Sequence, residues 1–369
     1  MLSDRTPPRS ISATHKTGHP PFEPRFLAAT ASALRHNLAT QDYALLTMHS
    51  YLLVRSLAAP DGPDAALSRP ITFGLWLVTV IALVATRGEV LPPGPLRAGL
   101  YRIGAFLPAI GSYFGLRWVL RAIEVDPLDA QLLAFERAIL GETPAVWMER
   151  WATSAAVEWF AFFYALYFAW IGLHVIGYMV FDETRRGGEL LVGATIILAT
   201  GHITYTLVPG VGPFAHIPGA FAEPLPGGLW WGVVQSLVAT AGALLDIFPS
   251  LHTAYPALFM LHAIRFRRAF PYRRIWIVTT FVAANMIVST VFLRWHYAVD
   301  VLAGLALAVA AQAIGIATLR RDSNRRGQPL FERLRPAGMG LRAYVRLVGI
   351  VSVQVAVLIG GVLFWLQRF

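Results

Sequence analysis

Two short segments of the sequence place a histidine among residues that suit phosphate chemistry, 248–252 (FPSLH) and 294–300 (RWHYAVD). His296 and Asp300 are four residues apart, so on a helix they lie on one face and can form a hydrogen bond. The carboxylate can then hold one ring nitrogen and leave the other free to attack phosphorus. The spacing therefore predicts a nucleophilic His296 that is oriented by Asp300.

The first segment predicts the start of a helix. Ser250 stands where an N-cap is expected, after Pro249 and before an apolar run that begins with Leu251 and His252. A helix start offers unpaired N–H groups and the positive end of the helix dipole, which suit a phosphate. His252 has the ordinary pKa range of a general acid, so it is the candidate for protonating a leaving alkoxide.

The first segment resembles the second signature motif of the phosphatidic acid phosphatase type 2 superfamily, Pro-Ser-Gly-His. Pro249, Ser250 and His252 match this motif, and Leu251 stands where glycine is usual. The Pro-Ser-Leu-His variant is similar to the inositol-phosphotransferase branch, which includes the fungal inositol phosphorylceramide synthases.

The second segment resembles the third signature motif, in which Ser-Arg is followed by five residues, His, three residues and Asp. Ser289, His296 and Asp300 match in spacing, and Thr290 stands where arginine is usual. The first signature motif, a lysine followed by Arg-Pro, is not recognisable. The resemblance is most specific over 248–304. It implies a six-helix membrane core, a phosphohistidine intermediate and no requirement for a metal or another cofactor.

Less specific interpretations exist for these residues. The pair of His296 and Asp300 is also compatible with a plain hydrogen bond inside a helix bundle, and His252 with an interfacial histidine that binds water. The joint occurrence of Ser250, His252, His296 and Asp300 at the motif spacing favours catalysis. An ionisable pair within a membrane span also points to function, because its burial is costly.

Further residues are candidates for substrate binding. Ser250 can hold a phosphate oxygen. Arg294 can replace the missing motif arginine as a bidentate phosphate clamp, and its alternative role is that of an interfacial anchor. His202 and Tyr205 lie near the outer end of their predicted span. They are expected there either to contact a headgroup or to form structural hydrogen bonds. The complete set of predicted substrate-binding residues is Ser250, Arg294, Ser289, Leu251, His202 and Tyr205.

Composition indicates the element type that must position these residues. The chain has 369 residues, of which 56% are hydrophobic and 14% are charged, whereas about 25% is usual in soluble domains. Several apolar runs approach the ~20 residues that cross a bilayer. The sequence therefore predicts an all-α polytopic membrane protein with about eight or nine membrane helices. The absence of cysteine excludes disulfides and thiolate chemistry.

The predicted organisation has five parts. They are a disordered basic cytoplasmic tail (1–40), flanking membrane helices (41–120), a catalytic membrane core (121–320) with an outer-face cap (209–247), a basic cytoplasmic loop (321–345) and a C-terminal membrane helix (346–369). The cap is predicted from its density of proline and glycine, which forbids a continuous helix. An amphipathic helix is expected over Leu128–Leu140, ended by Gly141.

The net charge of +10 arises mostly from arginines in loops between apolar runs. The positive-inside rule explains this pattern better than nucleic-acid binding does. The loops 265–274 and 320–346 are then cytoplasmic, which places His252 and His296 at the extracytoplasmic face. We expect a bacterial inner (plasma) membrane protein with nine crossings if 41–59 spans the bilayer, or eight if that segment is interfacial.

These observations favour a lipid phosphotransferase that moves an inositol-phosphate type of headgroup between lipids. One alternative is a phosphatase acting on phosphatidic acid or polyprenyl phosphates, in which water attacks the same intermediate. An alternative of another class is a non-catalytic membrane binding or transport protein. The expected partners are a lipid phosphate or phospholipid substrate and the membrane, without nucleic acid, and the oligomeric state is left open.

Overall fold

The computed structural model describes residues 24–181, 185–241, 243–326, 332, 334, 335, 338–340 and 342–348. The regular elements in this part of the chain are all helical. They are α1 (Pro24–Asn37), α2 (Thr40–Ala58), α3 (Pro63–Arg87), α4 (Pro95–Ala122), α5 (Asp129–Leu140), α6 (Pro144–Met148), η1 (Glu149–Trp151), α7 (Ser154–Ala165), α8 (Tyr167–Phe181), α9 (Arg185–Tyr205), α10 (Pro213–His216), η2 (Pro218–Ala220), α11 (Leu229–Ala241), α12 (Leu251–Arg265), α13 (Tyr272–Phe292) and α14 (Ala298–Arg326).

Local sequence explains several of these boundaries. Pro63 and Pro95 occupy the first positions of α3 and α4, where a missing N–H costs nothing. Helix α5 ends at Gly141, which adopts the left-handed conformation with φ of 78°. The amphipathic helix predicted over Leu128–Leu140 is therefore confirmed, together with its terminating glycine.

Six helical stretches among the described residues are long and apolar enough to cross a membrane. They are Pro63–Arg87, Pro95–Ala122, Ser154–Val180, Arg185–Tyr205, Tyr272–Phe292 and Ala298–Asn324. The predicted all-α, multi-pass membrane protein is thus confirmed.

Two helices that the predicted count of nine crossings includes, α12 and α2, are absent from this set of six. Helix α12 has only 15 residues, fewer than the ~20 that cross a bilayer. Helix α2 has 19 residues but carries Gln41, Asp42, His49 and Arg55, which lower its hydropathy. Most of the predicted C-terminal helix, 349–369, lies outside the described residues.

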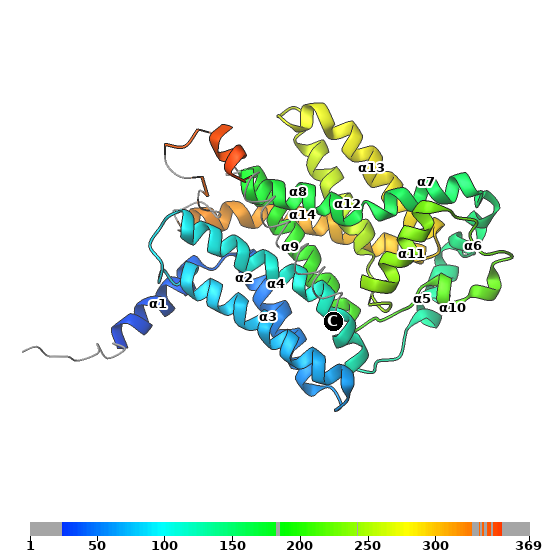
Figure 1. Ribbon diagram of the computed structural model, residues 1–369, viewed down its shortest axis with the longest axis horizontal. Helices are drawn as coiled ribbons and strands as arrows, with labels where there is room; N and C mark the ends of the chain where they lie inside the picture. Colours follow the sequence, from blue (N-terminus) through cyan, green and yellow to red (C-terminus); the bar gives the residue numbers. More distant parts are fainter. Residues whose placement is uncertain are drawn as a thin grey trace, which may run out of the picture.

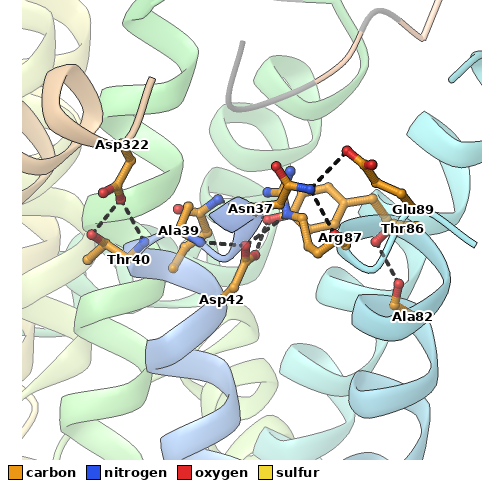
Figure 2. Close-up of polar contacts among 11 residues, drawn as sticks. Asn37, Ala39, Thr40, Asp42, Ala82, Thr86, Arg87, Glu89 and Asp322 are labelled. Carbon is orange, nitrogen blue, oxygen red and sulfur yellow. Dashed lines mark hydrogen bonds and ion pairs between the residues drawn. The ribbon is translucent and has the colours of Figure 1, made fainter. Parts of the chain in front are cut away.

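The prediction of a disordered tail over 1–40 is wrong for its last part, because Pro24–Asn37 forms α1. This segment is rich in alanine and leucine, which favour a helix. Its end is also held by tertiary contacts: the Asn37 side-chain amide donates to the Arg87 carbonyl and to Glu89 Oε1, both at 3.0 Å (Figure 2). Residues 1–23 lie outside the described part of the chain.

Helices α2, α3 and α4 pack side by side as an N-terminal bundle (Figure 1). A buried ion pair joins two of them, because Arg87 Nε donates to Asp42 Oδ2 at 2.8 Å (Figure 2). The Tyr101 hydroxyl donates to the other oxygen of Asp42 and thereby adds α4 to the network. The Thr40 N–H and hydroxyl both donate to Asp322 Oδ2 at 2.8 Å, which connects the bundle to the end of α14.

Helix α12 lies within the remaining bundle, against α8, α9, α13 and α14. Its middle is buried, with Leu258 and Phe259 almost fully covered. Helices α5, α6, α10 and α11 gather at the end of the molecule opposite α1 (Figure 1). The first residues of α12 and α14 lie toward this end, so the two predicted motifs are brought to one place.

Candidate active site

His296 and Asp300 form the predicted contact, but not from one helix face: α14 begins at Ala298, and His296 lies in the loop that precedes it. His296 Nδ1 lies 3.4 Å from Asp300 Oδ2, and both side chains are buried. The Tyr297 N–H donates to the same carboxylate oxygen at 2.9 Å. Asp300 is therefore held by the first turn of its own helix, and it leaves Nε2 of His296 as the ring nitrogen available for attack.

His252 lies in the first turn of α12 and is packed between two tyrosine rings. The Tyr164 ring stacks on it with centroids 4.4 Å apart, and the Tyr167 ring with centroids 3.9 Å apart. The centroid of the His296 ring is 6.1 Å from that of His252. Both histidines line one cavity, so the fold brings the two motifs together.

Ser250 is the N-cap residue of α12, as predicted, but its side chain does not cap the helix. The hydroxyl is fully buried and has no hydrogen-bond partner. The Ser250 N–H donates to the Asp300 carbonyl at 3.1 Å and so joins the starts of α12 and α14. Gly304 permits this contact, because a Cβ atom there would lie 2.5 Å from the Ser250 carbonyl oxygen.

Leu251, His202 and Tyr205 line the same cavity as the two histidines. His202 is fully buried, and its Nδ1 shares a hydrogen bond of 3.1 Å with Ser112 Oγ of α4. Its Nε2 has no partner. The structure thus places these three residues beside the histidines, while His202 also joins α9 to α4.

Arg294 and Ser289 do not line this cavity. Arg294 has a left-handed backbone with φ of 67°, and its Nη2 donates to Glu149 Oε1 at 3.0 Å. Its Nη1 donates to the Glu223 carbonyl at 3.0 Å, and it lines a second, more open pocket. The Ser289 hydroxyl donates to the Met286 carbonyl within α13 at 2.6 Å. These contacts direct both side chains to places outside the cavity of the two histidines, although Arg294 Nε is buried without a partner.

The cavity that the two histidines line, called the main cavity below, has a volume of about 460 Å³ and a mostly apolar lining. The pocket beside Arg294 is larger and more open, with about 1060 Å³. Asp246 adds a carboxyl group near the histidines, and burial raises the pKa of this group. No lysine or arginine occurs among the described residues that line the cavity. The described residues also contain no cluster of three or more histidine or acidic side chains suited to a metal ion.

Asp129 of α5 connects the cap segment to the His296 loop. Its carboxylate accepts the N–H groups of Val211 and Gly212, both at 2.8 Å, and the Tyr297 hydroxyl at 3.1 Å. Gly212 has φ of 81°, and a Cβ atom there would collide with the carbonyl oxygen of Trp295. The cap backbone therefore lies directly against the segment that carries His296.

Glu136 supports the same segment from the next turns of α5. Its Oε2 accepts the Ala298 N–H at the start of α14, and its Oε1 has no partner. Burial raises the pKa of Glu136 to about 7, and the nearby charge of Asp300 adds to this effect. The functional prediction missed Asp129 and Glu136. Their spacing of seven residues on an amphipathic helix is the signal that indicates one shared face.

Two more acidic residues hold the cap through its backbone. Glu149 accepts the N–H groups of Ala222 and Glu223 at 3.2 and 3.3 Å. Glu158 accepts the N–H groups of Gly228, Trp230 and Trp231 at 2.7 to 3.0 Å, which satisfies the start of α11. Residues 222–231, within the segment predicted as a cap, are thus anchored to η1 and α7.

The fold defines a multi-pass membrane protein, and a family match supports a lipid enzyme of the phosphatase type. Residues 130–314, half of the chain, match the family model described as PAP2 superfamily. The chain belongs to the PAP2 superfamily. Neither the search of curated proteins nor that of solved structures finds a match. The matched range contains both histidines and Asp300, whereas α1 to α4 precede it.

Proposed function

We propose that this protein transfers a phospho-headgroup from a phosphodiester lipid to a lipid hydroxyl, through a phosphohistidine on His296. The observation that carries the proposal is the meeting of His252 and His296 on one apolar cavity. An apolar cavity in a membrane enzyme suits the hydrocarbon part of a lipid, and two imidazoles beside it suit the cleavage of its phosphate ester.

In the first half-reaction, Nε2 of His296 attacks phosphorus and forms a P–N bond. The bond between phosphorus and the glycerol oxygen breaks, and protonated His252 transfers its proton to the leaving alkoxide. Asp300 holds the proton on Nδ1 and stabilises the positive charge that develops on the ring. The products of this step are a diacylglycerol and the headgroup phosphate on His296.

In the second half-reaction, the hydroxyl of the acceptor lipid attacks phosphorus. Neutral His252 takes the hydroxyl proton, and the P–N bond breaks, so His296 regains its lone pair. Each histidine ends in its starting state. The same sequence with water as acceptor is hydrolysis, so the exclusion of water from the cavity decides the outcome. The cap over 209–247 and its acidic anchors are the candidate barrier to water.

Charge supports a phosphodiester as the donor. A phosphate monoester carries about −1.5 to −2 charges at neutral pH, whereas a diester carries a single negative charge. The described lining of the cavity holds no lysine or arginine to offset that charge, and an apolar site penalises each uncompensated charge. Leu251 in the place of the usual glycine additionally supports an inositol-phosphate headgroup.

We further propose that the site faces the extracytoplasmic side of a bacterial inner membrane. The charge pattern supports this orientation, since α12 runs from His252 to Arg265 and is followed by four more arginines in 266–274. Under the positive-inside rule this arginine-rich loop is cytoplasmic. Because α13 is one of the six candidate spans, the start of α14 then lies on the opposite side, and the Ser250–Asp300 hydrogen bond keeps the start of α12 beside it.

The test uses the full chain purified in detergent. One reaction contains phosphatidylinositol with diacylglycerol or ceramide as acceptor, and another contains phosphatidic acid. Transferred headgroup in the first reaction, abolished in His296→Ala, supports the proposal. Release of free phosphate from phosphatidic acid without any headgroup transfer overturns it in favour of a phosphatase. Absence of turnover and of an acid-labile phosphoprotein with every lipid indicates a binding protein.

A further inference from the structure

The main cavity extends well beyond the two histidines. On α4 its lining includes Tyr101, Ala105, Ala109 and Tyr113, which are spaced four residues apart and so form one stripe. The two alanines leave space between the two tyrosines. The stripe is about 18 Å long at 1.5 Å per residue, which exceeds half of the ~30 Å hydrocarbon core of a bilayer.

Two hydrogen bonds show how α4 lies along the cavity. Near one end, Ser112 Oγ of α4 shares a hydrogen bond with His202 Nδ1 at 3.1 Å. Near the other end, Arg102 Nε donates to the carbonyl of Met179, the cavity-lining residue close to the end of α8, at 2.6 Å. The Tyr113 ring also contacts the Phe168 ring, with centroids 5.2 Å apart, and the neighbouring Tyr167 ring stacks on His252. The Tyr113 end therefore lies near His252, and the Tyr101 end lies toward the opposite side of the membrane.

The far end of the cavity, called its floor below, is formed by polar residues that contact one another. Gln41 and Tyr101 both line it, and Gln41 Nε2 donates to the Tyr101 hydroxyl at 2.9 Å. Tyr101 is held by its hydrogen bond to Asp42, and the Arg87 guanidinium lies 3.9 Å from its ring centroid. The buried ion pair of Asp42 and Arg87 contacts Tyr101 from outside the cavity and so supports this floor (Figure 2).

The cavity is accessible from the side. Six of its lining residues are also exposed large apolar side chains, and four of them lie on α4 and α8: Ile110 and Phe114 of α4 are 40% and 51% exposed, and Phe168 and Ile176 of α8 are 39% and 44% exposed. The other two, Leu237 and Leu244, are 38% and 46% exposed. In a membrane these positions face lipid. A hydrocarbon chain can thus enter between α4 and α8 without crossing water.

We propose that this cavity binds one hydrocarbon chain of the lipid substrate, with the phosphate at His296 and the chain end toward the floor of Gln41 and Tyr101. The second chain stays in the bilayer. The N-terminal bundle, which precedes the range matched by the family, supplies α4 as a wall and α2 as part of the floor. The distance between the histidines and this floor selects the chain length. This inference rests on the proposed function, because it assumes a lipid phosphate ester at His296.

The first test narrows the cavity at its middle. Ala105→Trp places a large ring in the α4 stripe, and Ile103→Trp is the matched control, because Ile103 is 56% exposed and does not line the cavity. Headgroup transfer is measured with dioctanoyl, dilauroyl and dipalmitoyl phosphatidylinositol. We expect Ala105→Trp to lower kcat/KM for the dipalmitoyl lipid about tenfold or more relative to the dioctanoyl lipid, with the control unchanged. An equal effect of both variants on all chain lengths overturns the proposal.

The second test needs no turnover and uses His296→Ala. Phosphatidylinositol and phosphatidic acid, each with a photoactivatable diazirine at the chain end or near the glycerol, are crosslinked to the protein and mapped by mass spectrometry. We expect the chain-end probe to label peptides around Tyr101 and Met179, and the glycerol-proximal probe those around Tyr113 and Phe168. Labelling by both probes only at lipid-facing positions such as Val78 and Ile277, outside the cavity, overturns the inference.

The two experiments separate this inference from the proposed function. In one outcome the crosslinking depends on probe position and is lost in Ala105→Trp, but no lipid is turned over. This outcome supports the chain-binding cavity and overturns the proposed reaction. Turnover that is insensitive to chain length, with crosslinks confined to the outer surface, retains the reaction and overturns the cavity assignment.

Discussion

The ring centroids of His252 and His296 lie 6.1 Å apart, although the two residues come from different helices. At this separation one phosphate ester can contact both rings, with phosphorus at one imidazole and the leaving oxygen at the other. The Ser250 N–H, which donates to the Asp300 carbonyl at 3.1 Å, holds the two helix starts together. The relative position of the two rings therefore depends on backbone contacts as well as on the rings themselves.

The first prediction separates the roles of the two histidines. His296→Ala is expected to abolish turnover of every substrate, because no nucleophile remains. His252→Ala is expected to lower kcat by about 10²- to 10⁴-fold with a natural lipid. With a p-nitrophenyl ester the leaving group needs no proton, so His252→Ala is expected to regain most of its activity and His296→Ala none. Equal rescue of both variants contradicts the assignment.

The second prediction concerns Asp300. Asp300→Asn keeps an oxygen that can accept the Tyr297 N–H but removes the charge that stabilises imidazolium. We expect kcat to fall by about 10⁴-fold, as in a Ser-His-Asp triad, with little change in the unfolding temperature. Measurement of both quantities is needed, since parallel losses of activity and stability would indicate that Asp300 only holds the fold.

The third prediction uses the raised pKa of Glu136, about 7 against an ordinary 4.5. The folded state favours the protonated carboxyl, so this stabilising contribution is present below about pH 4.5 and is lost as the pH rises through about 7. Glu136→Gln stays neutral. The unfolding temperature of Glu136→Gln relative to wild type is therefore expected to increase between about pH 5 and pH 8. If the difference in unfolding temperature between Glu136→Gln and wild type does not change with pH, Glu136 does not have the raised pKa that its burial implies.

The fourth prediction assigns Arg294 to the cap. Arg294→Met and Glu149→Gln each remove the ion pair in which these side chains lie 3.0 Å apart. We expect both variants to change KM to a similar extent and the double variant to cost no more than either single one, because contacting residues are not additive. A large loss of kcat in Arg294→Met together with a silent Glu149→Gln would instead show that Arg294 binds the reacting phosphate.

The fifth prediction concerns the N-terminal bundle. Asp42→Asn leaves the buried Arg87 without its charged partner and is expected to destabilise the protein by about 3 to 5 kcal/mol. The control is Asp61→Ala, which removes an ion pair whose carboxylate is 93% exposed and is expected to cost at most about 1 kcal/mol. Thermal unfolding in detergent compares the two. Equal effects would mean that burial of the first pair has no energetic consequence.

Several features followed from residue type and local spacing alone. The start of α12 after Ser250 follows from a proline, a capping residue and an apolar run. The pairing of His296 with Asp300 was predicted from helix spacing, but His296 lies in the loop before α14, which begins at Ala298, so the loop and the first helix turn together make this contact. The class of multi-pass membrane protein follows from long apolar segments, which a soluble protein does not need for its core. Helix boundaries and hydropathy depend on residues that are close together in the sequence, so the sequence alone is sufficient to predict them.

The tertiary structure decided which of these groups meet. Arg294 was predicted as a phosphate clamp from its distance along the chain to His296, but a left-handed backbone and the partner Glu149 place it in another pocket. The packing of His252 between Tyr164 and Tyr167 depends on a distant helix pair. The stripe of Tyr101, Ala105, Ala109 and Tyr113 on α4 lines a cavity only because α8 and α9 pack beside it. Such contacts depend on packing between segments far apart in sequence, which local pattern does not encode.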